Sequence, residues 1–160
     1  MTAIREASFE GLDARTGYLL WQLRQSVFVV EQQCFYLDLD GRDLEPSTRH
    51  LWVEEDGAPV AYLRVLTEPT PEDDSASRAD SAGGLRIGRV LVAQGHRGRG
   101  LAEQLMATAM RLVDGRPCRL DAQSYLVDWY RRLGFEPCGE EFLDDGIPHV
   151  PMRSAGVRGA

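Results

Sequence analysis

The chain has 160 residues, of which 43% are hydrophobic and 27% are charged, and its formal net charge at pH 7 is −7. This length suits one domain with a sizeable core, and the acidic balance disfavours nucleic acid as a partner, because a phosphate backbone is bound by an excess of basic side chains. All 18 basic residues are arginine, which excludes a P-loop lysine, a Schiff-base lysine and automodification on lysine.

The first half of the chain carries two apolar periodicities. Leu20, Leu23, Val27 and Val30 recur at intervals of three and four residues, which places them on one face of a helix. An Asp-Gly pair at 56–57 separates two β-rich runs and favours a tight hairpin turn. These patterns predict a strand at 3–9, a helix at 12–34, a polar and acidic loop at 35–50, and hairpin strands at 50–54 and 60–67.

The next expected strand runs from Leu85 to Val92 and changes phase along its length. Leu85 and Ile87 share one phase of the alternation, whereas Val90 and Val92 share the other. One extra residue at 88–89 would cause this slip and would form a β-bulge. A strand buried on both faces would give a similar pattern, so both interpretations stay open.

The second half of the chain continues the alternation of helices and strands. Leu101, Leu105, Ala109 and Leu112 form the inward stripe of a helix, and Ser124 is a plausible N-cap for a later one. The patterns predict helices at 99–113 and 124–133, strands at 118–123, 136–143 and 147–153, and a turn at 144–146. Together with the first half, they predict a mixed α/β sheet with helices on both faces.

Two segments give no packing signal. Residues 68–84 contain almost nothing to bury, so we expect a mobile loop there, and residues 154–160 are expected to form a flexible tail. Neither segment divides the chain, and we therefore expect a single domain over residues 1–160.

The cysteines and the N-terminal sequence bear on the compartment. Cys34, Cys118 and Cys138 are odd in number and widely spaced, so neither a disulfide framework nor a metal site follows. The N-terminus lacks a basic head followed by an apolar run, and no stretch approaches about 20 continuous apolar residues. These features predict a reduced, cytoplasmic protein without a metal or a membrane partner.

Three glycines and two arginines precede the helix expected at 99–113, in the stretch QGHRGRG at 94–100. The backbone amides at a helix N-terminus lack partners within the helix and lie at the positive end of its dipole, so anions bind there. Arg97 and Arg99 could add charge-assisted contacts to phosphate oxygens. A Walker loop is excluded by the absence of lysine, and the glycine spacing is the reverse of the dinucleotide fingerprint. A charged surface turn without a ligand is the plainer interpretation.

Several short motifs resemble one superfamily. Residues 97–102, RGRGLA, resemble the R-x-x-G-x-G/A motif of the GNAT N-acetyltransferases; residues 87–92 resemble their fourth strand; and residues 128–135, DWYRRLGF, resemble their F-Y-x-x-x-G-F signature. A narrower resemblance, to the bacterial ElaA-like branch, rests on further motifs that span about 130 residues. These further motifs are VFVVEQ at 27–32, DLDGRD at 38–43, RH at 49–50, AQ at 122–123 and DGIPH at 145–149.

The resemblance implies a GNAT fold and an acetyl-CoA site. The implied fold is a mixed, mostly antiparallel sheet of about six or seven strands with helices on both faces, splayed between the fourth and fifth strands. The implied pyrophosphate ligands are the backbone amides of Arg97, Gly98, Arg99, Gly100, Leu101 and Ala102. Leu91 and Val92 are expected to contact the pantetheine arm through their backbones, with one amide polarising the thioester carbonyl.

Two further residues receive roles from the resemblance. Tyr130 corresponds to a tyrosine that protonates the departing thiolate as a general acid, although its apolar periodicity alone favours a core tyrosine. Asp128 stands where many relatives carry an asparagine that bonds to the cofactor, and aspartate offers no amide donor.

Direct acetyl transfer requires a neutral amine, and a free alkylamine has a pKa of about 10, so a base is expected. Glu31, His50, Asp121 and His149 are candidates, and the resemblance ranks Glu31 and His149 first. Each of the four also has a purely structural interpretation. Acidic residues at 38–45 and 144–145 would attract a cationic amine.

The sequence leaves the acceptor open between a small amine, a peptide and a protein. The acyl preference is open too, as is the oligomeric state, with a homodimer as one option because GNAT relatives often dimerise. A non-catalytic acyl-CoA-binding regulatory module of the same fold is the alternative to an N-acetyltransferase.

Overall fold

The computed structural model describes residues 2–68 and 84–154. Nearly all of the loop expected at 68–84 and of the tail expected at 154–160 lies outside the described residues, so both expectations stay predictions. Ser154, the first residue assigned to that tail, is instead the buried last residue of a strand.

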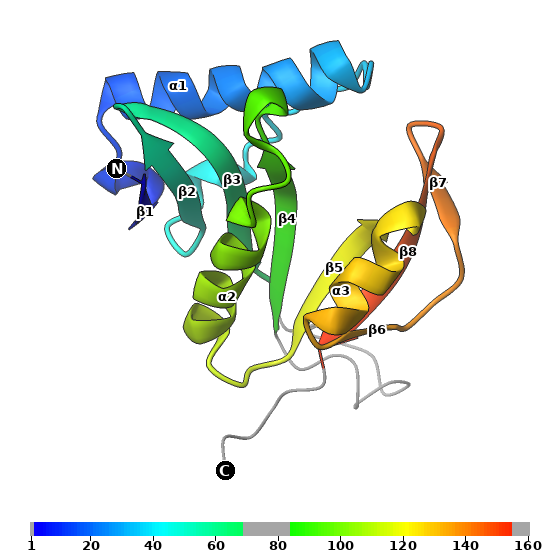
Figure 1. Cartoon of the computed structure of the whole chain (residues 1–160). Helices are drawn as coiled ribbons and strands as arrows, with labels where there is room; N and C mark the ends of the chain where they lie inside the picture. Colours follow the sequence, from blue (N-terminus) through cyan, green and yellow to red (C-terminus); the bar gives the residue numbers. More distant parts are fainter. Residues whose placement is uncertain (1, 69–83, 155–160) are drawn as a thin grey trace.

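The described residues form one sheet of eight strands in the order β1-β2-β3-β4-β5-β8-β6, with β7 paired to β8. Only the β4–β5 pair is parallel; the others are antiparallel (Figure 1). The strands are β1 (Thr2–Ala7), β2 (Arg49–Glu55), β3 (Ala58–Thr67), β4 (Leu85–Val92), β5 (Cys118–Gln123), β6 (Phe135–Pro137), β7 (Phe142–Asp144) and β8 (Ile147–Ser154). The count exceeds the expected six or seven because the strand expected at 136–143 is interrupted into β6 and β7.

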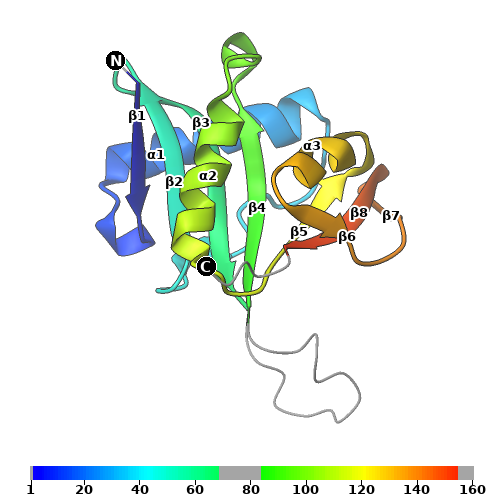
Figure 2. The same cartoon turned by 60° about the horizontal axis from the view of Figure 1, so that its bottom comes forward.

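Helices cover both faces of the sheet, as predicted (Figures 1 and 2). Alternate residues of a strand point to opposite faces, so Leu51 and Val53 of β2 pack in the core under α2 (Leu101–Val113). Trp52, which lies between them, packs on the other face with Leu20 of α1 (Ala14–Arg24). The shorter α3 (Val127–Arg132) lies against β5 and β6.

The first helix departs from its expected geometry at its C-terminal end. Leu20, Leu23 and Val27 are buried as predicted, but Val30 is 70% exposed and Phe28 is buried. The reason is that α1 continues into a π-helical segment, η2 (Gln25–Glu31). A π-turn contains more residues than an α-turn, so residues beyond Val27 rotate away from the face that an α-helical period assigns to them.

A β-bulge in β4 explains the phase change of that strand. Tyr62 of β3 pairs with Leu91 and Arg64 pairs with Gly88, so a single β3 residue opposes two residues of β4. Arg89 takes a left-handed conformation there, with φ of +53°. The bulge expected at 88–89 is therefore confirmed.

Beyond the bulge, β4 and β5 separate. Their pairing is confined to Leu85 with Cys118 and Arg86 with Arg119, so the two strands diverge toward their C-terminal ends (Figure 1). The splay predicted between the fourth and fifth strands is confirmed, and it leaves one edge of β4 open to a cavity.

The segment after β5 begins differently from the prediction. Ser124 starts a short 3₁₀ turn, η5 (Ser124–Leu126), before α3, and its hydroxyl donates to Glu141 Oε2 at 2.8 Å rather than capping a helix. Gly134, two residues beyond the end of α3, behaves as expected, since it has a φ of +96° and ends the helical segment.

Candidate active site

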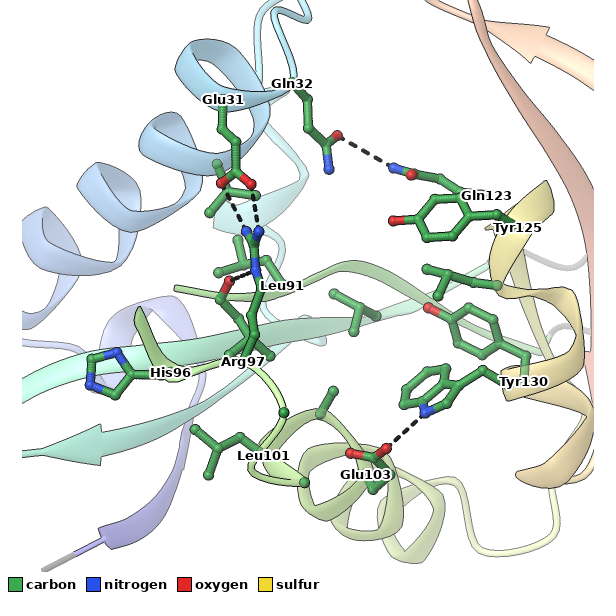
Figure 3. A pocket seen from close by; sticks show the side chains of 18 of the residues that line it. Glu31, Gln32, Leu91, His96, Arg97, Leu101, Glu103, Gln123, Tyr125 and Tyr130 are labelled. Carbon is green, nitrogen blue, oxygen red and sulfur yellow. Dashed lines mark hydrogen bonds and ion pairs between the residues drawn. The ribbon is translucent and has the colours of Figure 1, made fainter. Parts of the chain in front are cut away.

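A cavity of about 700 Å³ lies where β4 and β5 part (Figure 3). The start of α2 forms one side of it, the edge of β4 and the end of η2 form two more, and η5 with α3 forms the fourth. Its lining residues are Val27, Glu31, Gln32, Val90, Leu91, Val92, His96, Arg97, Gly98, Gly100, Leu101, Ala102, Glu103, Gln123, Tyr125, Leu126, Trp129, Tyr130 and Ile147.

The loop before α2 presents backbone donors at the mouth of this cavity. Within the described residues, the amides of residues 97–103 have no protein hydrogen-bond acceptor; the first amide of α2 that is bonded belongs to Gln104. Gly98 and Gly100 both have positive φ, +78° and +76°, a conformation that glycine adopts without strain. The turn therefore aims a row of free N–H groups, with the helix dipole behind them, at a position suited to an anion.

The two arginines of this loop are already paired with carboxylates. The guanidinium of Arg97 binds Glu31 through two hydrogen bonds of 2.5 and 2.8 Å, and its Nε donates to the Val92 carbonyl at 3.1 Å. Arg99 donates to the Glu55 carboxylate at 2.9 Å. Both guanidinium groups are thus engaged by carboxylates, and their contacts with phosphate stay a prediction.

The open edge of β4 offers the backbone of Val92 rather than that of Leu91. The Ala93 amide donates to Val60 of β3, and backbone groups two residues apart in a strand point to the same side. Leu91 therefore directs its amide and carbonyl toward β3. Val92 faces the cavity, as its bond from Arg97 shows. The contact predicted for Leu91 is thus limited to its side chain, which lines the cavity.

Tyr130 lies on the wall formed by α3, and its hydroxyl points into the cavity (Figure 3). The ring packs edge-on against Trp129 and Phe135, and only 6% of the residue is exposed. No hydrogen-bond partner of the hydroxyl occurs among the described residues. Burial, and to a smaller extent Tyr125, raises the pKa of Tyr130 above its ordinary value, so the phenol keeps its proton at neutral pH.

A second cavity, of about 190 Å³, adjoins the first. Asp121, Asp144, Asp145 and His149 all line it. Asp121 is paired with Arg86 at 3.0 Å, whereas no ion pair of Asp144 or Asp145 occurs within the described residues. Arg64, Arg86 and Arg89 line the same cavity, so its lining carries charges of both signs.

The candidate bases differ in their freedom to accept a proton. The bond from Arg97 lowers the pKa of Glu31, which weakens it as a base. His149 bonds through Nδ1 to the Ile147 carbonyl at 2.7 Å; because a carbonyl only accepts, Nδ1 carries the hydrogen and the neutral ring has an unprotonated Nε2. His50 is fully buried between Tyr62 and Asp43 and lines neither cavity.

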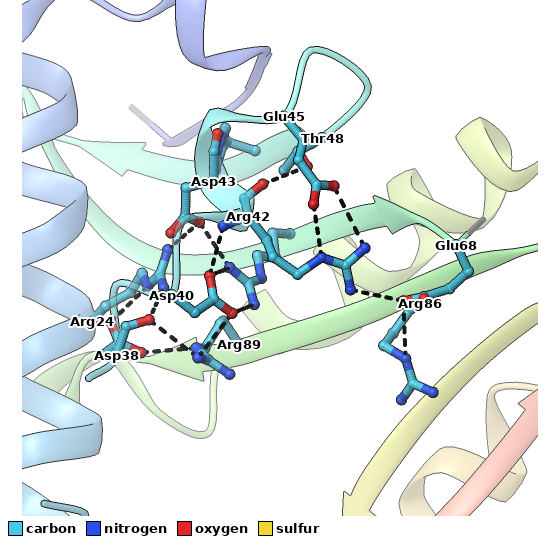
Figure 4. A network of polar contacts seen from close by, with 12 residues as sticks. Arg24, Asp38, Asp40, Arg42, Asp43, Glu45, Thr48, Glu68, Arg86 and Arg89 are labelled. Atoms are coloured by element: carbon cyan, nitrogen blue, oxygen red, sulfur yellow. Dashed lines mark hydrogen bonds and ion pairs between the residues drawn. The ribbon is translucent and has the colours of Figure 1, made fainter. Parts of the chain in front are cut away.

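Behind the sheet, a buried network of charged side chains joins α1, β3 and β4 (Figure 4). Asp43 Oδ1 accepts from Arg24 at 2.6 Å and from Arg64 at 3.0 Å. Asp38 accepts from Arg24 Nε at 2.9 Å and lies 2.8 Å from Arg89 Nε. Arg24 is 0% exposed and Asp43 is 4% exposed, so these charges are compensated almost entirely by one another.

The network reaches the site through Arg89. Besides its ion pair with Asp38, Arg89 donates to the Asp38 carbonyl at 3.1 Å, lies 3.6 Å from Asp40 and stacks over the Tyr36 ring at 5.6 Å. These contacts fix the side chain of the residue whose left-handed backbone forms the bulge. The loop that carries the aspartates therefore holds β4 in the shape that opens the cavity.

Searches for a metal site and a membrane span give no candidates in the part of the chain that the structure describes. Within residues 2–68 and 84–154, no three histidine, cysteine or acidic side chains gather closely enough to hold a metal ion. Among the helices described there, none has both the length and the apolar character needed to cross a membrane.

Comparison with known proteins identifies the family and the fold. The family described as "Acetyltransferase (GNAT) domain" matches residues 26–155, which is most of the chain. The chain belongs to this GNAT family. GNAT proteins use acyl-CoA co-substrates.

Relatives of this GNAT chain cover nearly its whole length. The UPF0039 protein Rv2851c of Mycobacterium tuberculosis is 46% identical over 158 residues, covering 96% of the chain and 94% of the relative. The crystal structure of Escherichia coli ElaA matches with a TM-score of 0.83 and 34% identity over 96% of this chain and 99% of that one. The crystal structure of an acyl-CoA N-acyltransferase from Pseudomonas aeruginosa matches with a TM-score of 0.85 and 38% identity over 97% and 100%. The predicted resemblance to ElaA is confirmed.

Not every residue assigned from the GNAT resemblance lies in the cavity. Residues 97–102 are brought together at its mouth, although the Arg99 side chain turns out toward Glu55. Asp128 lies on the outer face of α3, with its side chain 85% exposed and 3.4 Å from Arg131. A cofactor bound in the cavity reaches Asp128 only by extending beyond it.

Two side-chain pairs that cross this GNAT cleft carry no role in the sequence-based assignment. Trp129 Nε1 donates to Glu103 at 2.8 Å, which joins α3 to the first turn of α2. Gln123 Nε2 donates to Gln32 Oε1 at 3.3 Å, which joins the end of β5 to η2 (Figure 3).

Proposed function

We propose that this GNAT chain is an N-acetyltransferase that moves an acetyl group from acetyl-CoA directly to an amine in a ternary complex. The observation that carries the proposal is the row of partnerless amides at 97–103, placed at the mouth of a cavity that leads to the buried Tyr130 hydroxyl. Bound acetyl-CoA supplies an activated thioester. The acceptor is a small amine, a peptide or a protein.

Different groups of the chain then bind the cofactor, polarise its carbonyl and transfer protons. The loop amides hold the diphosphate, and an amide on the open edge of β4, at Val90 or Val92, polarises the thioester carbonyl. The amine nitrogen attacks the carbonyl carbon, so that the C–N bond forms and the C–S bond breaks. Tyr130 donates its proton to the departing sulfur. His149 Nε2 takes the proton from the amine, because His149 lines the smaller cavity and this nitrogen has no protein partner among the described residues.

Release of free thiol from acetyl-CoA in the presence of an amine panel tests the proposal. The panel contains small amines, polyamines, peptides and protein N-termini, and we expect acceptor-dependent thiol release with at least one class. Tight CoA binding without turnover on the whole panel would instead support the non-catalytic acyl-CoA-binding module. Absence of CoA binding to the folded protein would refute both.

Removing one loop amide weakens CoA binding. Ala102 lies in the first turn of α2, where proline is tolerated because that amide has no helical partner. Ala102→Pro is expected to lower CoA affinity about tenfold or more, since a hydrogen bond to a charged group contributes about 1.5–3 kcal/mol. Ala102→Val adds similar bulk but keeps the N–H. Isothermal titration with CoA should show near-parental affinity for Ala102→Val; an equal loss in both variants would remove the amide from binding.

Replacing His149 makes the reaction depend more strongly on pH. In His149→Gln the acceptor reacts only as the minor neutral amine, whose fraction rises about tenfold per pH unit below a pKa of about 10. We expect kcat/KM for the acceptor to fall about 10²-fold at pH 7 and to recover most of the deficit by pH 9.5. A deficit of the same size at both pH values would show that His149 is not the base.

A further inference from the structure

The two cavities adjoin each other where β4 and β5 diverge, and the gap between them is called the passage below. Six residues line both of them, and all lie where β4 and β5 part: Gln32, Val90, Gln123, Leu126, Tyr130 and Ile147. In the proposed function, the thioester lies at Tyr130 and the acceptor comes from the smaller cavity. The acyl group is therefore expected to contact these six residues, which form the shared wall of the two cavities.

The shared wall has an apolar part and a polar part. Val90, Leu126 and Ile147 are aliphatic, whereas Gln32 and Gln123 meet each other through the 3.3 Å bond (Figure 3). The two glutamines come from opposite sides of the gap, since Gln32 follows η2 and Gln123 ends β5. Their bond joins the two sides of the passage, and both carboxamides line the same two cavities as the aliphatic side chains.

We propose that the Gln32–Gln123 pair is a stop that limits the length of the acyl group. A short acyl chain contacts only the aliphatic wall. A longer chain must part the two carboxamides and cover them with methylene groups, and a buried amide without a hydrogen bond is unfavourable. The proposal rests on the proposed function, because it requires the thioester to lie at Tyr130.

Affinity measurements with a series of acyl-CoA thioesters, without acceptor, test the stop. We use CoA, acetyl-CoA, butyryl-CoA, hexanoyl-CoA and octanoyl-CoA with the parent protein and with Gln123→Ala. The parent is expected to bind CoA and acetyl-CoA similarly and hexanoyl-CoA at least tenfold more weakly. In Gln123→Ala the loss for hexanoyl-CoA should disappear, since each methylene buried in the opened passage contributes about fourfold in affinity, while the affinity for CoA stays unchanged.

Two further variants make the result decisive. Gln32→Ala removes the other half of the pair and should give the same change, which covers the case in which Gln123→Ala does not fold. Gln22→Ala alters an exposed glutamine of α1 outside both cavities and should keep the parental preference. Thermal melting followed by circular dichroism checks the folding of each variant.

The outcomes distinguish a failure of the proposed stop from a failure of the proposed function. Parental protein that binds neither CoA nor acetyl-CoA would refute the proposed function. Parental protein that binds CoA but binds octanoyl-CoA as tightly as acetyl-CoA would overturn the stop alone. An unchanged preference for short chains in folded Gln123→Ala and Gln32→Ala would also overturn it.

Discussion

Under the proposed function, Tyr130→Phe is expected to lower the turnover number for acetyl transfer by about 10²-fold or more, the contribution of a positioned general acid, and to leave the affinity for CoA near its parental value. The change removes one hydroxyl and keeps the ring that packs against Trp129 and Phe135. Because burial raises the pKa of Tyr130, its hydroxyl holds a proton that it can give to the departing sulfur. Without this donor, the sulfur must leave as an unprotonated thiolate or take its proton from water.

Steady-state kinetics with the acceptor from the amine panel, together with titration of CoA, measure both quantities. Tyr18→Phe is the matched control, since Tyr18 is 67% exposed on α1 and lines neither cavity. A Tyr130→Phe turnover number within twofold of the parent would remove this tyrosine from proton transfer. A loss confined to CoA affinity would make it a binding residue instead.

Asp43→Ala is expected to lower the free energy of unfolding by about 3–5 kcal/mol, the cost of removing one partner from a buried ion pair. Asp43 Oδ1 accepts from both Arg24 and Arg64, and neither arginine is more than 3% exposed. Without Asp43, two buried guanidinium groups share only the remaining aspartates. The free energy of unfolding decreases because the unfolded chain returns both arginines to water.

Urea unfolding followed by tryptophan fluorescence measures this loss. Glu45→Ala is the matched control in the same loop; its pair with Arg42 is partly exposed, with side chains 39% and 31% accessible, and such pairs contribute at most about 1 kcal/mol. Equal, small effects of both substitutions would show that the network does not stabilise the fold. The measurement is made at pH 7, where Asp40, another carboxylate of the network, is charged. Burial acts to raise the pKa of Asp40, but Arg64 lowers it well below its usual range, so this carboxylate stays charged until strongly acidic pH.

The fold was predictable where a local pattern has a local cause. The hairpin at Asp56-Gly57 follows from residues that accept positive φ, and the bulge at Arg89 follows from the phase change that one extra residue imposes on a strand. Val30 was not predictable in this way. The π-helical turn that exposes it is a departure from the 3.6-residue period on which the prediction depends.

The site was predictable where backbone geometry decides it. Glycines before a helix place free amides at its N-terminus, and residues 97–103 show this arrangement. The side chains of the same loop were not predictable, because Arg97 pairs with a residue 66 positions away and Arg99 with one 44 positions away. The burial of Arg24 was not predictable either. A charged side chain is expected at the surface, and only its hydrogen bonds with Asp38 and Asp43 explain why it is buried.

The bulge at Arg89 has a consequence for how this GNAT chain can vary. Its left-handed backbone is held in place by carboxylates from the loop before β2, on the far side of the sheet from α2. Substitutions in that loop would therefore change the aperture between β4 and β5 from a distance. Substrate range could drift in this way with every residue that touches the thioester left intact.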